Sequence, residues 1–206
     1  MQKDVLVIGE LNVDILFNDL GCLPKIGHEI LAEGMTFTLG SSSAILAANL
    51  SSLGVTTSIC GLVGKDLFGQ FVRSELNKKN VDTQFIIEDT ACQTGVTVIL
   101  NYDQDRANVT HCGAMEHFSL DQIPTEQFSH YRHLHLSSYF LQKGLQPDIV
   151  TLFRTAREKG LSTSLDMQWD PANEWNFPYH DCLPYVDFFL PNEAEVLALT
   201  GTDQLV

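Results

Sequence analysis

The sequence predicts an α/β fold in which a mostly parallel β-sheet is covered by helices on both faces. Short apolar runs alternate along the chain with amphipathic helical patterns, and this alternation is typical of parallel strands joined by crossover helices. The first apolar run, residues 5–9, is continuously hydrophobic and ends at a glycine. Strands that are buried on both faces of a sheet have this pattern.

The remaining elements of the main sheet follow along the chain. Five later runs are predicted to be strands: residues 56–61, 85–88, 133–137, 161–166 and 186–190. The apolar spacing after Asp66 predicts a helix with that residue as its N-cap and with lysines at its C-terminal end. A second helix is predicted between Pro147 and Gly160, because proline favours the first turn and glycine ends helices.

Two further stretches predict a second, smaller sheet. Residues 94–100 and 106–111 are rich in β-forming residues and are joined by a short polar segment, which indicates a hairpin. Residues 29–39 also alternate in polarity like a strand. Because a hairpin pairs its strands antiparallel, these segments do not fit the centre of a parallel sheet. We therefore expect a separate sheet that projects from the main domain.

Charge and cysteine content limit the partners and the compartment. The chain has 26 acidic and 12 basic residues, which gives a formal net charge of −14. This charge repels the phosphates of nucleic acids and anionic membranes, so we expect neither as a partner. The five cysteines lack a metal-binding spacing, and neither a signal peptide nor an apolar run of membrane-spanning length is recognisable. We expect a cytoplasmic protein with free thiols.

Polar side chains follow the first predicted strand. Asn12 and Asp14 lie two residues apart, so they point the same way if the chain is extended. A carboxylate accepts hydrogen bonds from two neighbouring hydroxyls, and an amide both donates and accepts, so the pair suits a polyol. An Asx turn that ends the strand is the alternative interpretation.

A glycine and three serines precede an alanine-rich helix. Gly40, Ser41 and Ser42 place backbone amides and hydroxyls at the start of this helix, where polar or anionic ligand groups bind well. Plain N-capping explains the same residues. The segment is not a Walker A loop, because the Gly-Lys-Ser/Thr ending is missing.

Acidic residues at the ends of two late strands suggest a cation site. Asn192 and Glu195 follow the run at 186–190, and Asp166 ends the run at 161–166. In the functional interpretation, these groups position a hydrated Mg²⁺ bound to phosphate, with Glu195 as the metal-associated residue. A capping box between Asn192 and Glu195 is the alternative. The histidines show no catalytic spacing, and we interpret them as structural.

Five motifs in this order resemble the pfkB (ribokinase-like) family of carbohydrate kinases, and the resemblance covers essentially the whole chain. The motifs are Gly9-x-x-Asn12-x-Asp14, the turn from Gly40 into the alanine-rich helix that ends at Leu53-Gly54, Gly61-x-Val63-Gly64-x-Asp66-x-Phe68-Gly69, Thr94-Gly95, and Pro191-Asn192-Glu193-x-Glu195 with Leu199-Thr200-Gly201. The resemblance implies a ribokinase-like α/β/α sandwich with a small β-sheet lid, whose strands lie within residues 12–39 and 94–112.

The resemblance also implies a function. It implies ATP-dependent phosphorylation of a hydroxyl on a sugar or sugar-like polyol, with ATP and Mg²⁺ as cofactors. Asn12 and Asp14 would bind the sugar, with Gly40 and the serines after it at the sugar's edge, and Asn192 and Glu195 would influence Mg²⁺ and phosphate. Lid hairpins of this family often contribute to dimer contacts, so a homodimer through the lid is expected.

The chain departs from the family pattern in two ways. Ser41 stands where the family has a second glycine, and Ile45 stands where an asparagine contacts the sugar, so the substrate-binding set includes an apolar side chain. The family's Gly-Ala-Gly-Asp motif, which supplies the catalytic base, does not occur before Val206. We therefore expect these 206 residues to be the N-terminal part of a kinase domain and to be inactive alone. A nucleoside kinase and a non-catalytic sugar-binding pseudo-kinase are the alternatives.

Overall fold

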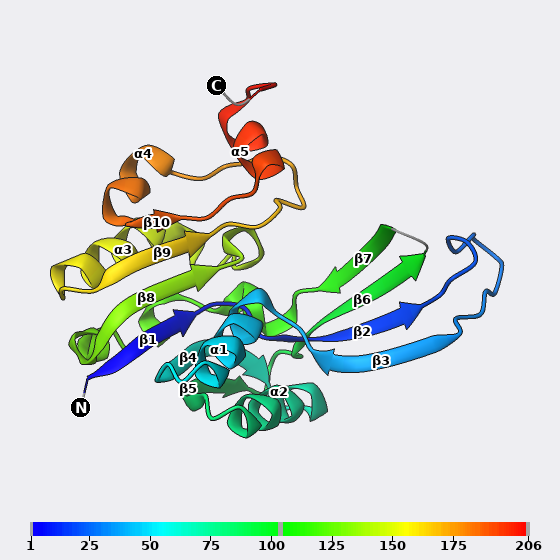
Figure 1. The fold of residues 1–206 in the computed structure, drawn as a ribbon, viewed down its shortest axis with the longest axis horizontal. Coiled ribbons are helices and arrows are strands. Elements are labelled where there is room, and N and C mark those ends of the chain that lie inside the picture. The colour runs from blue at the N-terminus through cyan, green and yellow to red at the C-terminus, as the bar shows by residue number, and fades with distance from the viewer. Residues whose placement is uncertain (1, 103–104, 205–206) are drawn as a thin grey trace.

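A computed structural model describes residues 2–102 and 105–204 and contains two β-sheets (Figure 1). The larger sheet, sheet A, has six strands in the order β10-β9-β8-β1-β4-β5, and every neighbouring pair is parallel. Its strands are β1 (Lys3–Ile8), β4 (Thr57–Gly64), β5 (Asp82–Asp89), β8 (Tyr131–Ser137), β9 (Ser162–Asp166) and β10 (Phe188–Phe189). The predicted α/β class with a mostly parallel sheet is confirmed.

Helices cover both faces of sheet A, as the alternating pattern predicts. Helices α1 (Ser42–Ser52) and α2 (Leu67–Lys78) pack on one face, and α3 (Ile149–Glu158) with the short α4 (Tyr179–Cys182) packs on the other (Figure 1). A hydrophobic core lies on each face of sheet A, and the side chains of β1 alternate between the two cores. Val7 packs with α1 and α2, whereas Leu6 and Ile8 pack with Phe153 of α3. Alternate residues of a central strand face opposite sides, which explains the continuous apolar run.

Sheet B projects away from the carboxyl edge of sheet A, as Figure 1 shows. Its order is β3-β2-β6-β7, with β2 (Asn12–Asn18), β3 (Gly34–Leu39), β6 (Gly95–Tyr102) and β7 (Asp105–His111). The predicted hairpin is present, because β6 and β7 pair antiparallel from Val96 with His111 to Tyr102 with Asp105. Its connecting residues 103–104 lie outside the described residues. Strands β2 and β6 pair in parallel, which joins two hairpins into one sheet.

Two predicted strands are shorter than the sequence indicates. Residues 29–39 were expected to alternate as one strand, but β3 begins only at Gly34. Its partner β2 ends at Asn18, opposite Gly34, and Asp19 then turns with φ 56°, so the residues before Gly34 have no strand to pair with. At residues 186–190, only Phe188 and Phe189 form a strand, β10.

Capping interactions set the start of two helices. The Asp66 side chain accepts a hydrogen bond from the amide of Gly69 at the start of α2, as predicted. Helix α5 (Glu193–Thr200) begins with a capping box between Asn192 and Glu195. Short 3₁₀ turns complete the connections: η1 (Gly113–His117), η2 (Leu120–Gln122), η3 (Thr125–His130), η4 (Tyr139–Leu141), η5 (Gln146–Asp148) and η6 (Leu183–Tyr185). Among the described residues, no helix combines the length and apolarity needed to cross a bilayer.

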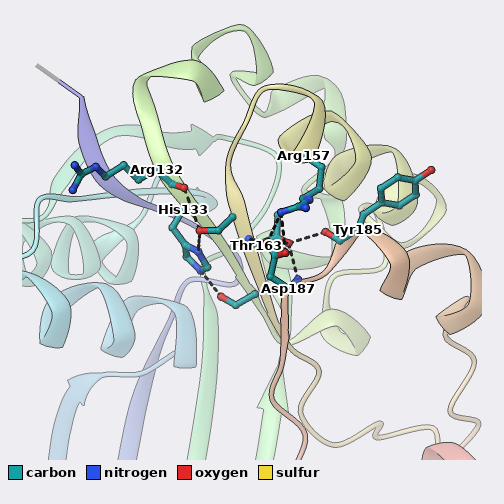
Figure 2. Close-up of polar contacts among 8 residues, drawn as sticks. Arg132, His133, Arg157, Thr163, Tyr185 and Asp187 are labelled. Atoms are coloured by element: carbon teal, nitrogen blue, oxygen red, sulfur yellow. Dashed lines mark hydrogen bonds and ion pairs between the residues drawn. The ribbon is translucent and has the colours of Figure 1, made fainter.

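Polar contacts fix the short strand β10 against its neighbours (Figure 2). The carboxylate of Asp187 accepts hydrogen bonds from the Arg157 guanidinium on α3, at 2.7 and 2.8 Å, and from the amide of Thr163 on β9, at 2.9 Å. The Thr163 hydroxyl donates to the carbonyl of Tyr185 at 2.7 Å. These contacts hold β10 in the sheet, and α5 follows it at the carboxyl edge.

Candidate functional site

The predicted pair Asn12 and Asp14 lies at the base of sheet B, on β2. The amide nitrogen of Asn12 donates to Asp14 Oδ1 at 3.2 Å and to the Thr97 hydroxyl of β6 at 3.0 Å. The Thr97 hydroxyl is 3.0 Å from that of Thr110 on β7. Four polar groups from three strands therefore form one hydrogen-bonded row.

The register of sheet B explains why these groups meet. Asp14 lies opposite Thr38 of β3 and Thr97 of β6, and Thr97 lies opposite Thr110, so all four side chains share one face. The alternate positions on the other face are mostly apolar. There Phe37 packs on Phe71 and Phe68 of α2, with ring centroids 4.4 and 5.7 Å apart. Sheet B thus has a polar face at Asp14 and an apolar face against α2.

Gly40 packs directly against the polar face. A β-carbon at Gly40 would lie 2.2 Å from Asp14 Oδ1 and 3.1 Å from the amide nitrogen of Asn12, so the close approach requires glycine. The next residue, Ser41, has φ 70°, a left-handed value that glycine adopts without strain. Its hydroxyl accepts a hydrogen bond from the amide of Ala44 and so caps α1. The alternative capping interpretation of this serine is therefore observed.

The amides expected to be free at the start of α1 are paired with an internal carboxylate. Glu10 Oε1 accepts hydrogen bonds from the Ser42 amide at 2.7 Å, the Ser42 hydroxyl at 2.5 Å and the Ser43 amide at 3.3 Å, and Oε2 accepts from the Ser43 hydroxyl at 2.6 Å. Glu10 is 3% exposed. The prediction that these donors are available to a ligand is corrected, because a buried carboxylate at a helix N-terminus satisfies them.

Two polar residues in left-handed conformations continue the cluster along the edge of sheet A. Ser138 follows β8 with φ 56°, and Gln168 follows β9 with φ 59°. The Ser138 hydroxyl donates to Gln168 Oε1 at 2.8 Å and lies 3.1 Å from the Ser42 hydroxyl. Non-glycine residues in this region cost about 1–3 kcal/mol each and concentrate at functional sites. The carboxyl edge of sheet A therefore carries a connected polar network from Gln168 to Glu10, in which Ser138 and Glu10 are buried.

The acidic pair predicted to lie near a cation occupies the same edge. Burial raises the pKa of Asp166, and the charges of Glu195 and Glu10 raise it further. Both Glu195 oxygens already contact Asn192: Oε2 accepts from the backbone amide at 3.0 Å, and Oε1 from the side-chain amide at 2.8 Å. The capping box is thus observed. The Glu195 charge still acts on Asp166.

Mg²⁺ commonly binds through one or two carboxylates and keeps several waters, so a site of three ligands is not required. Among the described residues, no group of three or more histidine, cysteine, aspartate or glutamate side chains is arranged to hold a metal. Asp166 and Glu195 fit a water-mediated Mg²⁺ better than a direct protein cage.

The remaining predicted substrate residue, Ile45, lies on the first turn of α1. It is three residues after Ser42, so both lie on the same side of the helix. Ile45 is 43% exposed, whereas Ala44, Ala47 and Ala48 of the same helix are buried in the core. An exposed isoleucine beside the polar turn cannot form hydrogen bonds with a ligand.

Two histidines support β8 and β9 beneath this edge. His133 lies 2.7 Å from the hydroxyls of both Ser162 and Ser164, and His135 lies 2.7 Å from those of Ser164 and Ser137 (Figure 2 shows His133). Burial, together with the smaller effect of the charge of His133, lowers the pKa of His135 to about 4. Both rings serve as structural links between strands, which agrees with their structural interpretation.

Sequence reasoning missed three members of the polar edge: Glu10, Ser138 and Gln168. A signal existed for Glu10, because it precedes Asn12 and Asp14 at the same two-residue spacing. No sequence signal indicates that Ser138 and Gln168 adopt left-handed conformations, since neither is glycine or asparagine.

Comparisons with known proteins agree on one family. The model of the pfkB family of carbohydrate kinases matches residues 2–205. The chain is 28% identical over 198 residues to an ATP-dependent ribose-1-phosphate kinase of Halopiger xanaduensis, a match that covers 95% of this chain and 63% of that protein. It is 32% identical over 88 residues to a 5-dehydro-2-deoxygluconokinase of Geobacillus kaustophilus, covering 42% of this chain and 24% of that protein.

Solved structures show the same fold. Ribokinase of Arabidopsis thaliana, in a complex with ribose and ATP, superimposes with a TM-score of 0.81 at 23% identity. That match covers 100% of this chain and 65% of the ribokinase chain. At this identity the likeness establishes the ribokinase-like fold. The chain therefore spans less than two thirds of the length of these relatives.

Proposed function

Because the chain belongs to the pfkB family of carbohydrate kinases, we propose that the protein transfers the γ-phosphoryl group of ATP to a hydroxyl of a sugar or sugar-like polyol. The single observation that carries the proposal is the polar row of Asn12, Asp14, Thr97 and Thr110 beside Gly40. Burial raises the pKa of Asp14, and the charge of Glu10 raises it further. A half-buried carboxylate held by an amide is suited to accept hydrogen bonds from neighbouring sugar hydroxyls.

The residues of this chain position the sugar and exclude water. Phosphoryl transfer requires mainly in-line positioning and charge neutralisation. Asp14 and Asn12 would hold the sugar on the polar face of sheet B, and sheet B would act as the lid over it. The turn at Gly40, Ser41 and Ser42 would line the sugar's edge, with Ile45 against a less oxygenated part of it.

Nucleotide and metal complete the proposal. ATP supplies the phosphoryl group, and Mg²⁺ neutralises charge on its phosphates. Asp166 and Glu195 would attract a hydrated Mg²⁺ at the carboxyl edge of sheet A, with Asn192 fixing the Glu195 carboxylate. We further propose that the catalytic base is not among these 206 residues, and that they have negligible kinase activity alone.

A nucleoside kinase is a second candidate, favoured by one observation. Trp169 directly follows Gln168 at the carboxyl edge of sheet A and is 53% exposed. Its ring packs edge-on against Trp175, with centroids 4.9 Å apart. An exposed, supported aromatic ring is suited to stack on a nucleobase.

The test is a combined binding and turnover screen of the full-length protein. Thermal shift and ADP release are measured with Mg-ATP and ribose, ribose 1-phosphate, fructose, 2-keto-3-deoxygluconate, inositol or adenosine. We expect at least one sugar to stabilise the protein and to release ADP. Asp14→Asn should abolish both signals, while Asp181→Asn, an exposed aspartate on α4, should leave both unchanged.

Each other result of the screen indicates a different function for the protein. Stabilisation by a sugar without ADP release refutes the kinase proposal and indicates the non-catalytic sugar-binding alternative. Adenosine turnover that is lost in Trp169→Ala indicates the nucleoside kinase. No binding at all refutes every form of the proposal.

We also propose a homodimer formed through sheet B. Its apolar face extends beyond α2, where Met35 is 62% and Val109 is 65% exposed. Apolar surface on a projecting sheet is typical of a protein–protein contact, and a second copy is the proposed occupant. Sedimentation should detect a dimer that Val109→Asp disrupts; a wild-type protein that remains monomeric at high concentration contradicts this.

A further inference from the structure

The candidate site contains its own buried anion. Glu10 accepts four hydrogen bonds from the amides and hydroxyls of Ser42 and Ser43. The N-terminus of α1 is the kind of position that binds a ligand phosphate or carboxylate. Because Glu10 already accepts hydrogen bonds from the amides of Ser42 and Ser43, a ligand anion does not find these two amides free.

Glu10 lies close enough to a bound sugar to influence its substituents. Gly40 packs against the Asp14 carboxylate, the Ser41 hydroxyl donates to the backbone carbonyl of Glu10, and the Ser42 hydroxyl donates to the Glu10 carboxylate. A sugar held by Asp14 at this turn therefore has its edge directed toward Ser42 and the Glu10 carboxylate.

The surrounding charges are mostly of the same sign. The charge of Glu10 acts on both Asp14 and Asp166, so the Glu10 carboxylate lies close enough to interact with each of them. Arg106 on β7 is the one cation among the described residues whose charge acts on Asp14. One guanidinium opposes three carboxylates, which leaves the sugar edge with a negative potential.

We propose that this site selects an uncharged sugar and discriminates against sugar acids and sugar phosphates, with Glu10 as the specificity-determining residue. The inference deepens the proposed function and rests on it. Bringing like charges together lowers affinity, and the Ser42 and Ser43 amides, which would offset that cost, already bind Glu10. Glu10 acts in two ways: it fixes the turn at α1 and it repels an anionic substituent.

The first experiment compares matched ligands on the full-length wild-type protein by calorimetry. The pairs are ribose with ribose 1-phosphate, and glucose with gluconate, without nucleotide or Mg²⁺ so that only the protein's charges act. We expect the neutral member of whichever pair binds to bind at least about tenfold more tightly. Raising the salt concentration should narrow the difference, because ions screen the repulsion.

Variants then assign the effect to Glu10. Glu10→Gln removes the charge at nearly constant shape and should reduce the ratio of the two affinities by about tenfold or more. Glu158→Gln removes one charge from an exposed position on α3 and should leave the ratio unchanged. Circular dichroism and binding of the neutral sugar verify that Glu10→Gln remains folded.

The outcomes separate this inference from the proposed function. If the anionic member binds wild-type protein as tightly as the neutral one, the inference is overturned while the sugar kinase proposal stands. A ratio that does not change in folded Glu10→Gln overturns the role of Glu10. If no member of either pair binds and the full screen also finds no sugar, the proposed function fails and this inference fails with it.

Discussion

Acid should destabilise the protein through His135, and the size of the effect follows from its surroundings. The ring is 6% exposed, and its two nitrogens face only serine hydroxyls, those of Ser164 and Ser137. Among the described residues, no carboxylate contacts the His135 ring. The charge of His133 acts on His135, and the charge of Asp187 acts on His133. Burial therefore disfavours the protonated form, and the pKa of His135 falls from 6.5 to about 4.

The sign and magnitude follow from proton linkage. Because the folded-state pKa is depressed, the unfolded chain binds more protons between about pH 4 and pH 6.5, so stability falls as the pH falls through that window. A shift of one pKa unit corresponds to about 1.4 kcal/mol, so the loss approaches roughly 3 kcal/mol at low pH. Between pH 7 and pH 5 we expect about 2 kcal/mol of this loss.

Urea unfolding at pH 7 and pH 5 measures the effect, with two variants as references. His135→Gln cannot titrate, so its free energy of unfolding should change by about 2 kcal/mol less than that of wild type between the two pH values. His180→Gln removes an exposed histidine on α4 and should behave like wild type. Equal pH dependence of wild type and His135→Gln would refute the reasoning.

Three further substitutions test the turn before α1. Gly40→Ala places a methyl group against the Asp14 carboxylate and should lower kcat/KM for the sugar by about 100-fold, with little change in melting temperature; unchanged kinetics contradict the proposed contact. Ser41→Ala loses the cap and keeps the positive φ, so it should cost about 1–2 kcal/mol in urea unfolding, whereas Ser41→Gly should cost only about a few tenths; the reverse order contradicts this. Ile45→Asn introduces a hydrogen-bonding group and should shift preference by about fivefold toward a sugar with an additional hydroxyl; an unchanged substrate profile excludes contact with the sugar.

The elements that the sequence predicts best depend on local pattern. The apolar run at the start of β1, the Asp66 cap and the Asn192 capping box each follow from residues close together in the chain, and the structure contains all of them. Which strands pair with each other is harder to predict from the sequence. The extent of β3 depends on where β2 ends, so the alternating residues before Gly34 were misleading.

The candidate site was predictable only in part for the same reason. Asn12, Asp14 and Gly40 carry family motifs, and the structure brings them into contact. The pairing of Glu10 with the start of α1 joins residues about thirty positions apart, and no periodicity encodes it. The sequence shows donors at a helix N-terminus, but not the acceptor that another segment provides.

The parallel pairing of β2 with β6 has a consequence for how the chain folds. Each lid hairpin is local, β2 with β3 and β6 with β7, but the seam between them joins Asp14 to Thr97. Between those strands the chain builds α1, β4, α2 and β5 of the main domain. Closing so long a loop is slow, and it becomes favourable only after the intervening segment has collapsed. We therefore expect the two hairpins of sheet B to pair with each other only after the main domain between them has formed.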